Sequence, residues 1–263
     1  MTPREIVCRC IEFRRPPRIG LHFQTDPIQG QVWKDSDFVG VGYASEARFN
    51  RQSGQSEWVT EWGVRRRAIN TEVGEAVESP LAQGWHLLDQ FPFPDLGAAW
   101  RYARLGQEVA AAHAAGLYVC GSIPGLMLLP ADLRGMENWL ADNILEPDNL
   151  GRLMDRILAI RAAIIEHYAA AGVDGVITWD DMGTNTQVFV SPAMFRKLYL
   201  PRYKQTIDHL HERRMHFIHH CCGQVRQYVD LFIEAGCDVL QLDQPELMGI
   251  DWLAEHAGGR ICF

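Results

Sequence analysis

A short apolar run follows an alanine–glycine pair at four places along the chain. These runs begin after Gly116, Gly172, Gly236 and Gly258, and each follows a segment with helical character. A glycine just past a helix supplies the left-handed residue that ends it, and a short continuous apolar run is typical of a strand buried on both faces. The pattern predicts helices that alternate with parallel strands, which defines an α/β fold.

Two of the predicted helices have clear boundaries. Pro147 suits the first turn of a helix, and apolar residues then recur at helical spacing up to Gly172. Ser191 followed by Pro192 predicts the start of another helix, with serine as the N-cap, and this helix continues to about Arg214.

Together with two earlier runs, the apolar segments give seven candidate strands. A (β/α)₈ barrel needs eight, so we expect a TIM barrel that lacks its last βα unit. The candidate strands are residues 18–23, 37–43, 117–121, 174–179, 216–221, 239–243 and 260–263.

Residues 44–96 interrupt this alternation. They contain three tryptophans, two Phe-Pro steps and several glycines, and we interpret them as a hairpin-containing insertion after the second strand. An insertion at that point would lie over the mouth of a barrel, where active sites are built. Its aromatic residues, Trp62 among them, either line a pocket or form a small core of their own. We expect residues 1–263 to form a single barrel domain that carries this insertion.

Composition narrows the class of protein and the kinds of partner. With 263 residues, 47% of them hydrophobic, the chain can bury a large core, and its net charge of -8 disfavours nucleic acid and anionic membranes. Small molecules and other proteins are the better partners. The N-terminus lacks a signal-peptide pattern and no apolar run approaches the ~20 residues of a membrane span, so we expect a soluble, cytoplasmic protein. Seven cysteines, an odd number, indicate reduced thiols.

Three successive predicted strands end in polar residues, and the most unusual of these ends is Phe217-Ile-His-His-Cys-Cys-Gly-Gln224. Side chains alternate along a strand, so His219 shares a face with Cys221, and His220 with Cys222. Only one of these pairs can point into a barrel. A histidine and a thiolate two residues apart could be the first two ligands of a tetrahedral zinc ion. The alternative, a buried histidine and cysteine satisfied by the backbone, carries equal weight.

The neighbouring strand ends supply carboxylates and an amide. Asp180 and Asp181 point to opposite faces, so one of them faces the site as a metal ligand, a general base or a partner of a substrate cation, and the other holds the loop. Asp243 and Gln244 end the following strand. Three polar clusters at one rim indicate a site more strongly than any one of them alone.

The motifs, in this order along the chain, resemble those of the uroporphyrinogen decarboxylase superfamily. The resemblance implies a (β/α)₈ barrel with its site at the carboxyl ends of the strands. It rests on Met1-Thr-Pro-Arg-Glu5, Glu61-Trp-Gly-Val64, Pro92-Phe-Pro-Asp95, Asp180-Asp-Met-Gly183, Ser191-Pro192 with Phe195 and Pro201, and His220-Cys-Cys-Gly223.

The superfamily contains two chemistries, and the resemblance favours one of them. True decarboxylases carry an arginine-rich segment after the first strand, whereas residues 23–30 of this chain contain no arginine. In the cobalamin-dependent methyltransferases, a His-x-Cys pair and a distant third cysteine hold zinc, and a separate corrinoid protein carries the methyl group. Matching that motif selects His220 and Cys222. The third cysteine would lie near an eighth strand, beyond Phe263.

The resemblance thus implies a zinc-assisted methyltransferase or demethylase. Asp180 or Asp181 would orient the substrate or add a metal ligand, and Asp243 would act as an acid or base or support the ligands. Expected substrate contacts are Trp62, Gln187 and Gln244. Two alternatives stay open: a metal-free decarboxylase of a porphyrinogen or smaller acid, and a non-catalytic barrel that binds a corrinoid or tetrapyrrole.

Overall fold

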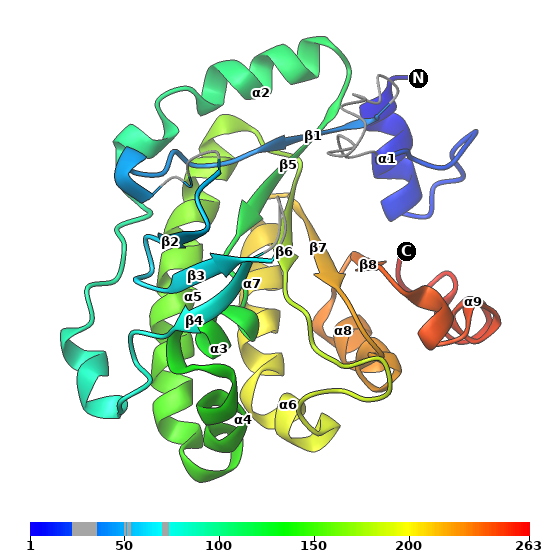
Figure 1. The fold of residues 1–263 in the computed structure, drawn as a ribbon. Helices are drawn as coiled ribbons and strands as arrows, with labels where there is room; N and C mark the ends of the chain where they lie inside the picture. The colour runs from blue at the N-terminus through cyan, green and yellow to red at the C-terminus, as the bar shows by residue number, and fades with distance from the viewer. Residues whose placement is uncertain (23–35, 50, 52–53, 70–73) are drawn as a thin grey trace.

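The structure is a computed structural model that describes residues 1–22, 36–49, 51, 54–69 and 74–263. Its main sheet is parallel throughout and has the strand order β1-β5-β6-β7-β8 (Figure 1). These strands are β1 (Phe38–Val41), β5 (Tyr118–Ile123), β6 (Gly175–Trp179), β7 (His216–Cys221) and β8 (Val239–Leu242). A separate antiparallel sheet contains β2 (Glu57–Val59), β3 (Arg65–Ala68) and β4 (Gly74–Glu78).

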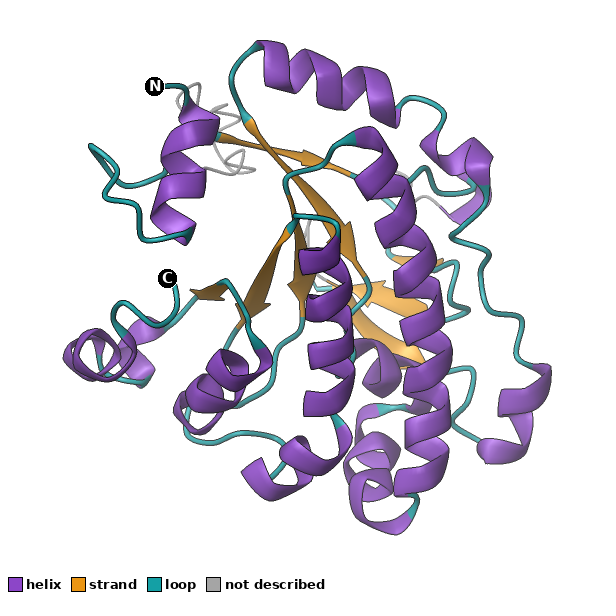
Figure 2. Ribbon diagram, turned by 180° about the vertical axis from the view of Figure 1, so that it is seen from behind, coloured by secondary structure: helices purple, strands orange, loops and turns teal. Residues whose placement is uncertain are grey.

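Helices connect the strands of the main sheet and cover its outer face (Figure 2). The long helix α5 packs against α7, and α7 packs in turn against β7 and α8. The α-helices are α1 (Pro3–Ile11), α2 (Leu105–Ala114), α3 (Leu128–Arg134), α4 (Met136–Leu145), α5 (Pro147–Ala171), α6 (Pro192–Leu198), α7 (Leu200–Glu212), α8 (Val229–Ala235) and α9 (Ile250–Ala257).

This arrangement confirms the predicted α/β barrel type. Parallel strands that follow one another in the sheet, with helices between them on the outer face, form the wall of a (β/α)₈ barrel. The described strands make an arc that does not close on itself, and both termini lie on its open side (Figures 1 and 2). The inner face of the arc packs on α1 through a small apolar cluster that includes Val7, Tyr118 and Ile218.

Five of the seven candidate strands form as predicted, and the first and last do not. Residues 18–22 are not in a strand, and Phe23 lies outside the described residues. The carboxylate of Asp37 accepts hydrogen bonds from the Arg18 guanidinium (2.6 and 2.8 Å) and from the Leu21 N–H (2.7 Å), so a side chain holds this segment. At the other end, Cys262 joins the sheet by a single parallel bridge to Val239.

The helix expected at 147–172 is present as α5, but the one expected over 191–214 is two helices. Ser191 caps α6 as predicted, accepting a hydrogen bond from the Met194 N–H. The first helix then ends at Tyr199, and Pro201 lies in the first turn of α7. Proline has no N–H to donate to the preceding turn, so one continuous helix through this position is disfavoured.

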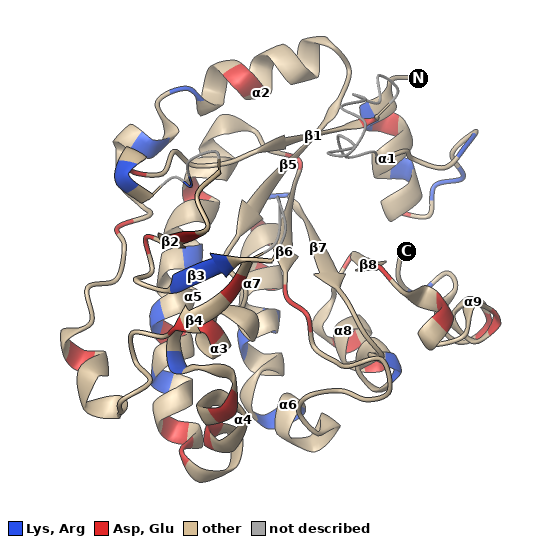
Figure 3. Cartoon of the chain, viewed as in Figure 1, with Lys and Arg blue, Asp and Glu red and all other residues tan. Residues whose placement is uncertain are grey.

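The predicted hairpin in the insertion is confirmed by β2, β3 and β4, with β3 paired antiparallel to both neighbours. The guanidinium of Arg66 forms an ion pair with Asp132 of α3, the helix that follows the carboxyl end of β5. The basic run on β3 stands out against charges that are otherwise spread over the chain (Figure 3).

Among the helices in the described part of the chain, none is long and apolar enough to cross a bilayer.

Gly175 tests the packing of the main sheet. A methyl group there would overlap the hydroxyl of Tyr118 and lie 3.2 Å from the carbonyl oxygen of His216. We expect Gly175→Ala to lower the free energy of unfolding by about 1–3 kcal/mol, because overpacking forces neighbours to move. Urea unfolding followed by circular dichroism measures this.

The matched control is Gly106→Ala in α2, where a methyl group meets no atom within 4 Å. Alanine is the better helix former, so this variant should gain about 0.5–1 kcal/mol. Equal stability of the two variants would contradict the packing described here.

Candidate metal centre

The ends of β6 and β7 bring the polar residues together. In the parallel register Trp179 pairs with His220, so the residues that follow them also meet. The Asp180 N–H donates to the His220 carbonyl (3.1 Å), and the Cys222 N–H donates to Asp181 Oδ1 (2.8 Å). These bonds continue the contact between the two segments beyond the last strand residues.

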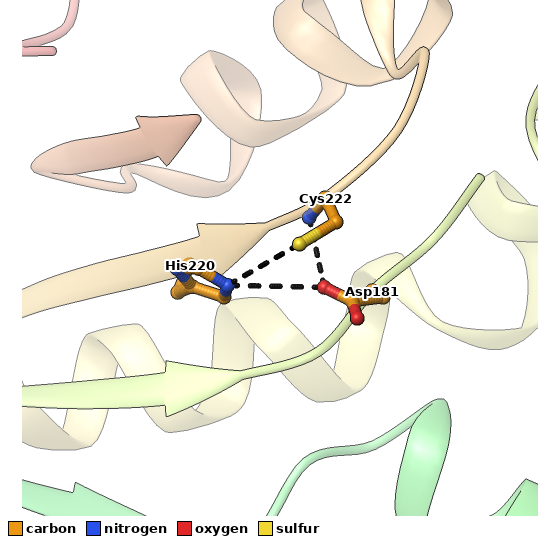
Figure 4. Close-up of side chains that lie close together, drawn as sticks. All are labelled: Asp181, His220 and Cys222. Carbon is orange, nitrogen blue, oxygen red and sulfur yellow. Dashed lines mark hydrogen bonds and ion pairs between the residues drawn. The ribbon is translucent and has the colours of Figure 1, made fainter. Parts of the chain in front are cut away.

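Asp181, His220 and Cys222 form a tight triangle of possible metal ligands (Figure 4). His220 Nε2 lies 3.7 Å from Cys222 Sγ and 3.8 Å from Asp181 Oδ1. The three ligand atoms all lie within 4.8 Å of one another. One nitrogen, one sulfur and one carboxylate oxygen therefore lie close enough together to bind one metal ion.

This donor set fits zinc. Zinc bonds of about 2.0–2.3 Å in tetrahedral geometry place ligand atoms roughly 3.3–3.8 Å apart, which matches the two distances from His220 Nε2. His220 is only 7% exposed, and its Nδ1 makes no hydrogen bond within the described part of the chain but lies 3.9 Å from Asp243 Oδ1. A carboxylate beside the second ring nitrogen is the usual arrangement around a metal-binding histidine.

The Cys222 thiol lies between two carboxylates. It donates to Asp243 Oδ2 (3.5 Å), while Asp181 approaches from the other side. Burial, followed by the hydrogen bond to Asp181 and the negative charge of that carboxylate, raises the pKa of Cys222 to about 12. The thiol therefore keeps its proton at neutral pH unless a cation beside it favours the thiolate.

Asp180 faces away from the centre, into the layer between the sheet and the helices. It is fully buried and accepts hydrogen bonds from the N–H groups of Leu126, Met127 and Leu128 (2.6–3.0 Å) and from the Tyr203 hydroxyl. Burial raises the pKa of Asp180, and these hydrogen bonds oppose that shift. Of the two adjacent carboxylates, the structure brings Asp181 to His220 and uses Asp180 to hold the loop before α3.

The pair His219 and Cys221 lies on the same outer face as Asp180. His219 is completely buried and stacks on Phe232 with ring centres 4.3 Å apart, and neither ring nitrogen has a hydrogen-bond partner among the described residues. Burial lowers the pKa of His219 well below its usual value, so the ring is neutral. Cys221 is 1% exposed, and burial raises the pKa of its thiol. Strand alternation thus places this pair in the core.

The expected substrate contacts are scattered. Gln244 Oε1 accepts the Gly223 N–H (2.7 Å) and so holds the backbone just after Cys222. Gln187 is exposed in the loop after β6, where its backbone bonds to Thr184. Trp62 packs edge-on against Phe93 in the insertion, with ring centres 6.4 Å apart. Of the three, only Gln244 contacts a residue next to the centre.

Sequence reasoning assigned no role to Trp179, although it contacts the centre directly. Its ring centre lies 4.3 Å from that of His220, and the side chain is 42% exposed. The available signal was its spacing, because Trp179 lies two residues before Asp181 and so shares its face.

The fold and these side chains define a barrel-type α/β protein with a candidate metal centre at its strand ends. The model of the uroporphyrinogen decarboxylase (URO-D) family matches residues 108–261, more than half of the chain, and the chain belongs to this family. The arginine-free segment 23–30 lies outside the described residues.

The chain also resembles solved structures, among them a methyltransferase from Methanosarcina mazei. That match has a TM-score of 0.67 and 13% sequence identity, and it covers 95% of this chain and 80% of the other. At this identity the likeness concerns the fold. Comparison with the curated proteins gives no match.

Asp180→Ala should be strongly destabilising. The substitution leaves three backbone N–H groups, two of them buried, and the buried Tyr203 hydroxyl without their acceptor, and we expect a loss of at least about 3 kcal/mol. Tyr203→Phe removes only one of these bonds and should cost about 1 kcal/mol. Urea denaturation of both variants tests the order, and an Asp180→Ala protein as stable as wild type would contradict the role given to this carboxylate.

Proposed function

We propose that this chain is a metal-assisted methyltransferase or demethylase of the URO-D family. It would move a methyl group between a small molecule and a corrinoid carried by a partner protein. The observation that carries the proposal is the triangle of Asp181, His220 and Cys222, whose spacing suits a tetrahedral zinc ion.

Each ligand has support from its surroundings. His220 Nε2, Cys222 Sγ and Asp181 Oδ1 would hold the ion. Asp243 lies beside both His220 and Cys222, so it would orient the imidazole, while the thiol proton passes to solvent as the metal binds. When bound, zinc would polarise a methyl donor or hold an acceptor thiol as its thiolate.

The charge of the site disfavours the decarboxylase alternative. An acidic substrate needs cations to neutralise it, yet within the described residues neither Asp181 nor Asp243 pairs with an arginine or lysine.

All seven cysteines are free thiols. A centre that contains one of them suits the reducing cytoplasm, where we propose that the protein works.

Metal analysis tests the centre. We expect zinc-loaded, desalted wild type to retain about one zinc per chain, and His220→Ala and Cys222→Ala to lose it. Asp181→Asn should weaken zinc binding by at least ~10-fold. Mass spectrometry of the metal, with the absorption of a Co²⁺-substituted sample, provides the readout.

Matched controls are His256→Ala and Cys262→Ala, which change the same residue types outside the triangle and should keep the metal. Asp180→Asn is the control for Asp181→Asn, because it changes the adjacent carboxylate. It should lower the stability of the protein and leave its zinc content nearly unchanged. A folded wild type that retains no zinc would rule out the metal centre.

Methyl transfer can be followed in the cobalamin spectrum. We expect zinc-loaded protein to methylate cob(I)alamin from a suitable donor, and Cys222→Ala to be slower by at least about 100-fold, equivalent to about 2.7 kcal/mol in the barrier. Release of carbon dioxide from a carboxylic acid, without methylation of cobalamin, would instead identify a decarboxylase.

A further inference from the structure

An aromatic face lies free beside the candidate centre. Trp179 is the last residue of β6, and its ring lines a cavity of about 790 Å³ along the inner face of the sheet. Most of the lining is apolar and includes Phe38, Ile177 and Ile218. The arginine–aromatic stacking contacts of the described residues involve other rings. The indole face is therefore open to a ligand in this cavity.

Negative charge lies at the strand ends next to Trp179, outside the residues that line the cavity. The side chains of Asp181 and Asp243 are 39% and 50% exposed, and their only ion-pair partner among the described residues is His220. A Zn²⁺ ion held by neutral His220, the Cys222 thiolate and the Asp181 carboxylate would make a neutral unit. The carboxylate of Asp243 would then still carry one negative charge beside it.

His220 touches both groups, which places them within reach of one ligand. Its ring centre is 4.3 Å from that of Trp179, and its Nδ1 is 3.9 Å from Asp243 Oδ1. An organic cation binds an aromatic face when it lies within roughly 6 Å of the ring centre, and methylated ammonium groups are the ligands best suited to this contact. Their methyl groups also suit the apolar lining.

We infer that a methylated onium ion, such as a quaternary ammonium compound, binds at the end of the cavity where Trp179 lies, between its indole and the carboxylate of Asp243. The role of this ion as the methyl donor rests on the proposed function. In that transfer the N–CH₃ bond breaks and its electron pair stays on nitrogen, which leaves as a neutral amine. The methyl group bonds to the Co(I) corrinoid, which supplies the new electron pair and becomes Co(III).

Three ligands of nearly equal shape but different charge distinguish the effect of ligand charge on affinity from the effect of ligand size. Isothermal titration of the zinc-loaded protein compares choline with the neutral 3,3-dimethylbutan-1-ol and the anionic 3,3-dimethylbutanoate. Choline should bind at least roughly fivefold more tightly than the alcohol, and the anion most weakly. Binding of the alcohol as tight as that of choline would overturn the inference.

Substitutions of Trp179 and Asp243 test whether these two residues cause the preference for choline over the alcohol. Trp179→Leu and Asp243→Asn should each reduce the preference for choline over the alcohol by at least roughly threefold. Trp100→Leu and Asp251→Asn change exposed residues of the same types away from the cavity and should keep it. A preference that survives both cavity substitutions would overturn the inference.

The zinc content of each sample distinguishes this inference from the proposed function. A protein that selects choline but retains no zinc would overturn the proposed metal centre and support the onium site. A protein that retains zinc and shows no selectivity would overturn the onium site alone.

Discussion

The candidate centre depends on the buried carboxylate of Asp180. By accepting three backbone N–H groups before α3 and the hydroxyl of Tyr203, it ties the end of β6 to the loop after β5 and to α7. The positive charge of the fully buried Arg161 lies nearby, which helps to compensate a carboxylate in this setting. Since Asp180 is fixed on the outer face, the next residue, Asp181, must turn to the inner face.

The same alternation divides β7. His219 fills a space among aromatic rings in the core, and its neighbour His220 turns to the other face, toward Trp179 and Asp181. The parallel register then aligns His220 with Trp179, so the inner-face residues of two strands meet at one level. A core that fixes the outer residues thereby positions the inner ones, which is how a rigid scaffold holds ligands at metal-binding distances.

Much of this could be predicted from the sequence. Three of the four alanine–glycine pairs located a turn from helix to strand, because Gly116, Gly172 and Gly236 are left-handed as predicted, whereas at the fourth pair the left-handed residue is Gly259 and a single bridge follows. The period of two divided the histidines and cysteines into the pairs that the structure places on opposite faces. The sequence did not separate the roles of Asp180 and Asp181, because that choice depends on N–H groups more than fifty residues away. The break at Tyr199 has a weaker local signal, because apolar residues keep their helical spacing through it and Pro201 is compatible with the first turn of a helix.

The third donor shows why the geometry matters for chemistry. In the methyltransferases that the chain resembles the third ligand is a second cysteine, whereas the structure brings Asp181, one of the two carboxylates expected as possible ligands, to the two matched residues. A carboxylate is a harder ligand than a thiolate and donates less electron density. A zinc ion held by one thiolate and one carboxylate would keep more positive charge than one held by two thiolates. Such an ion would be the stronger Lewis acid, better suited to polarising an oxygen or stabilising an incoming thiolate.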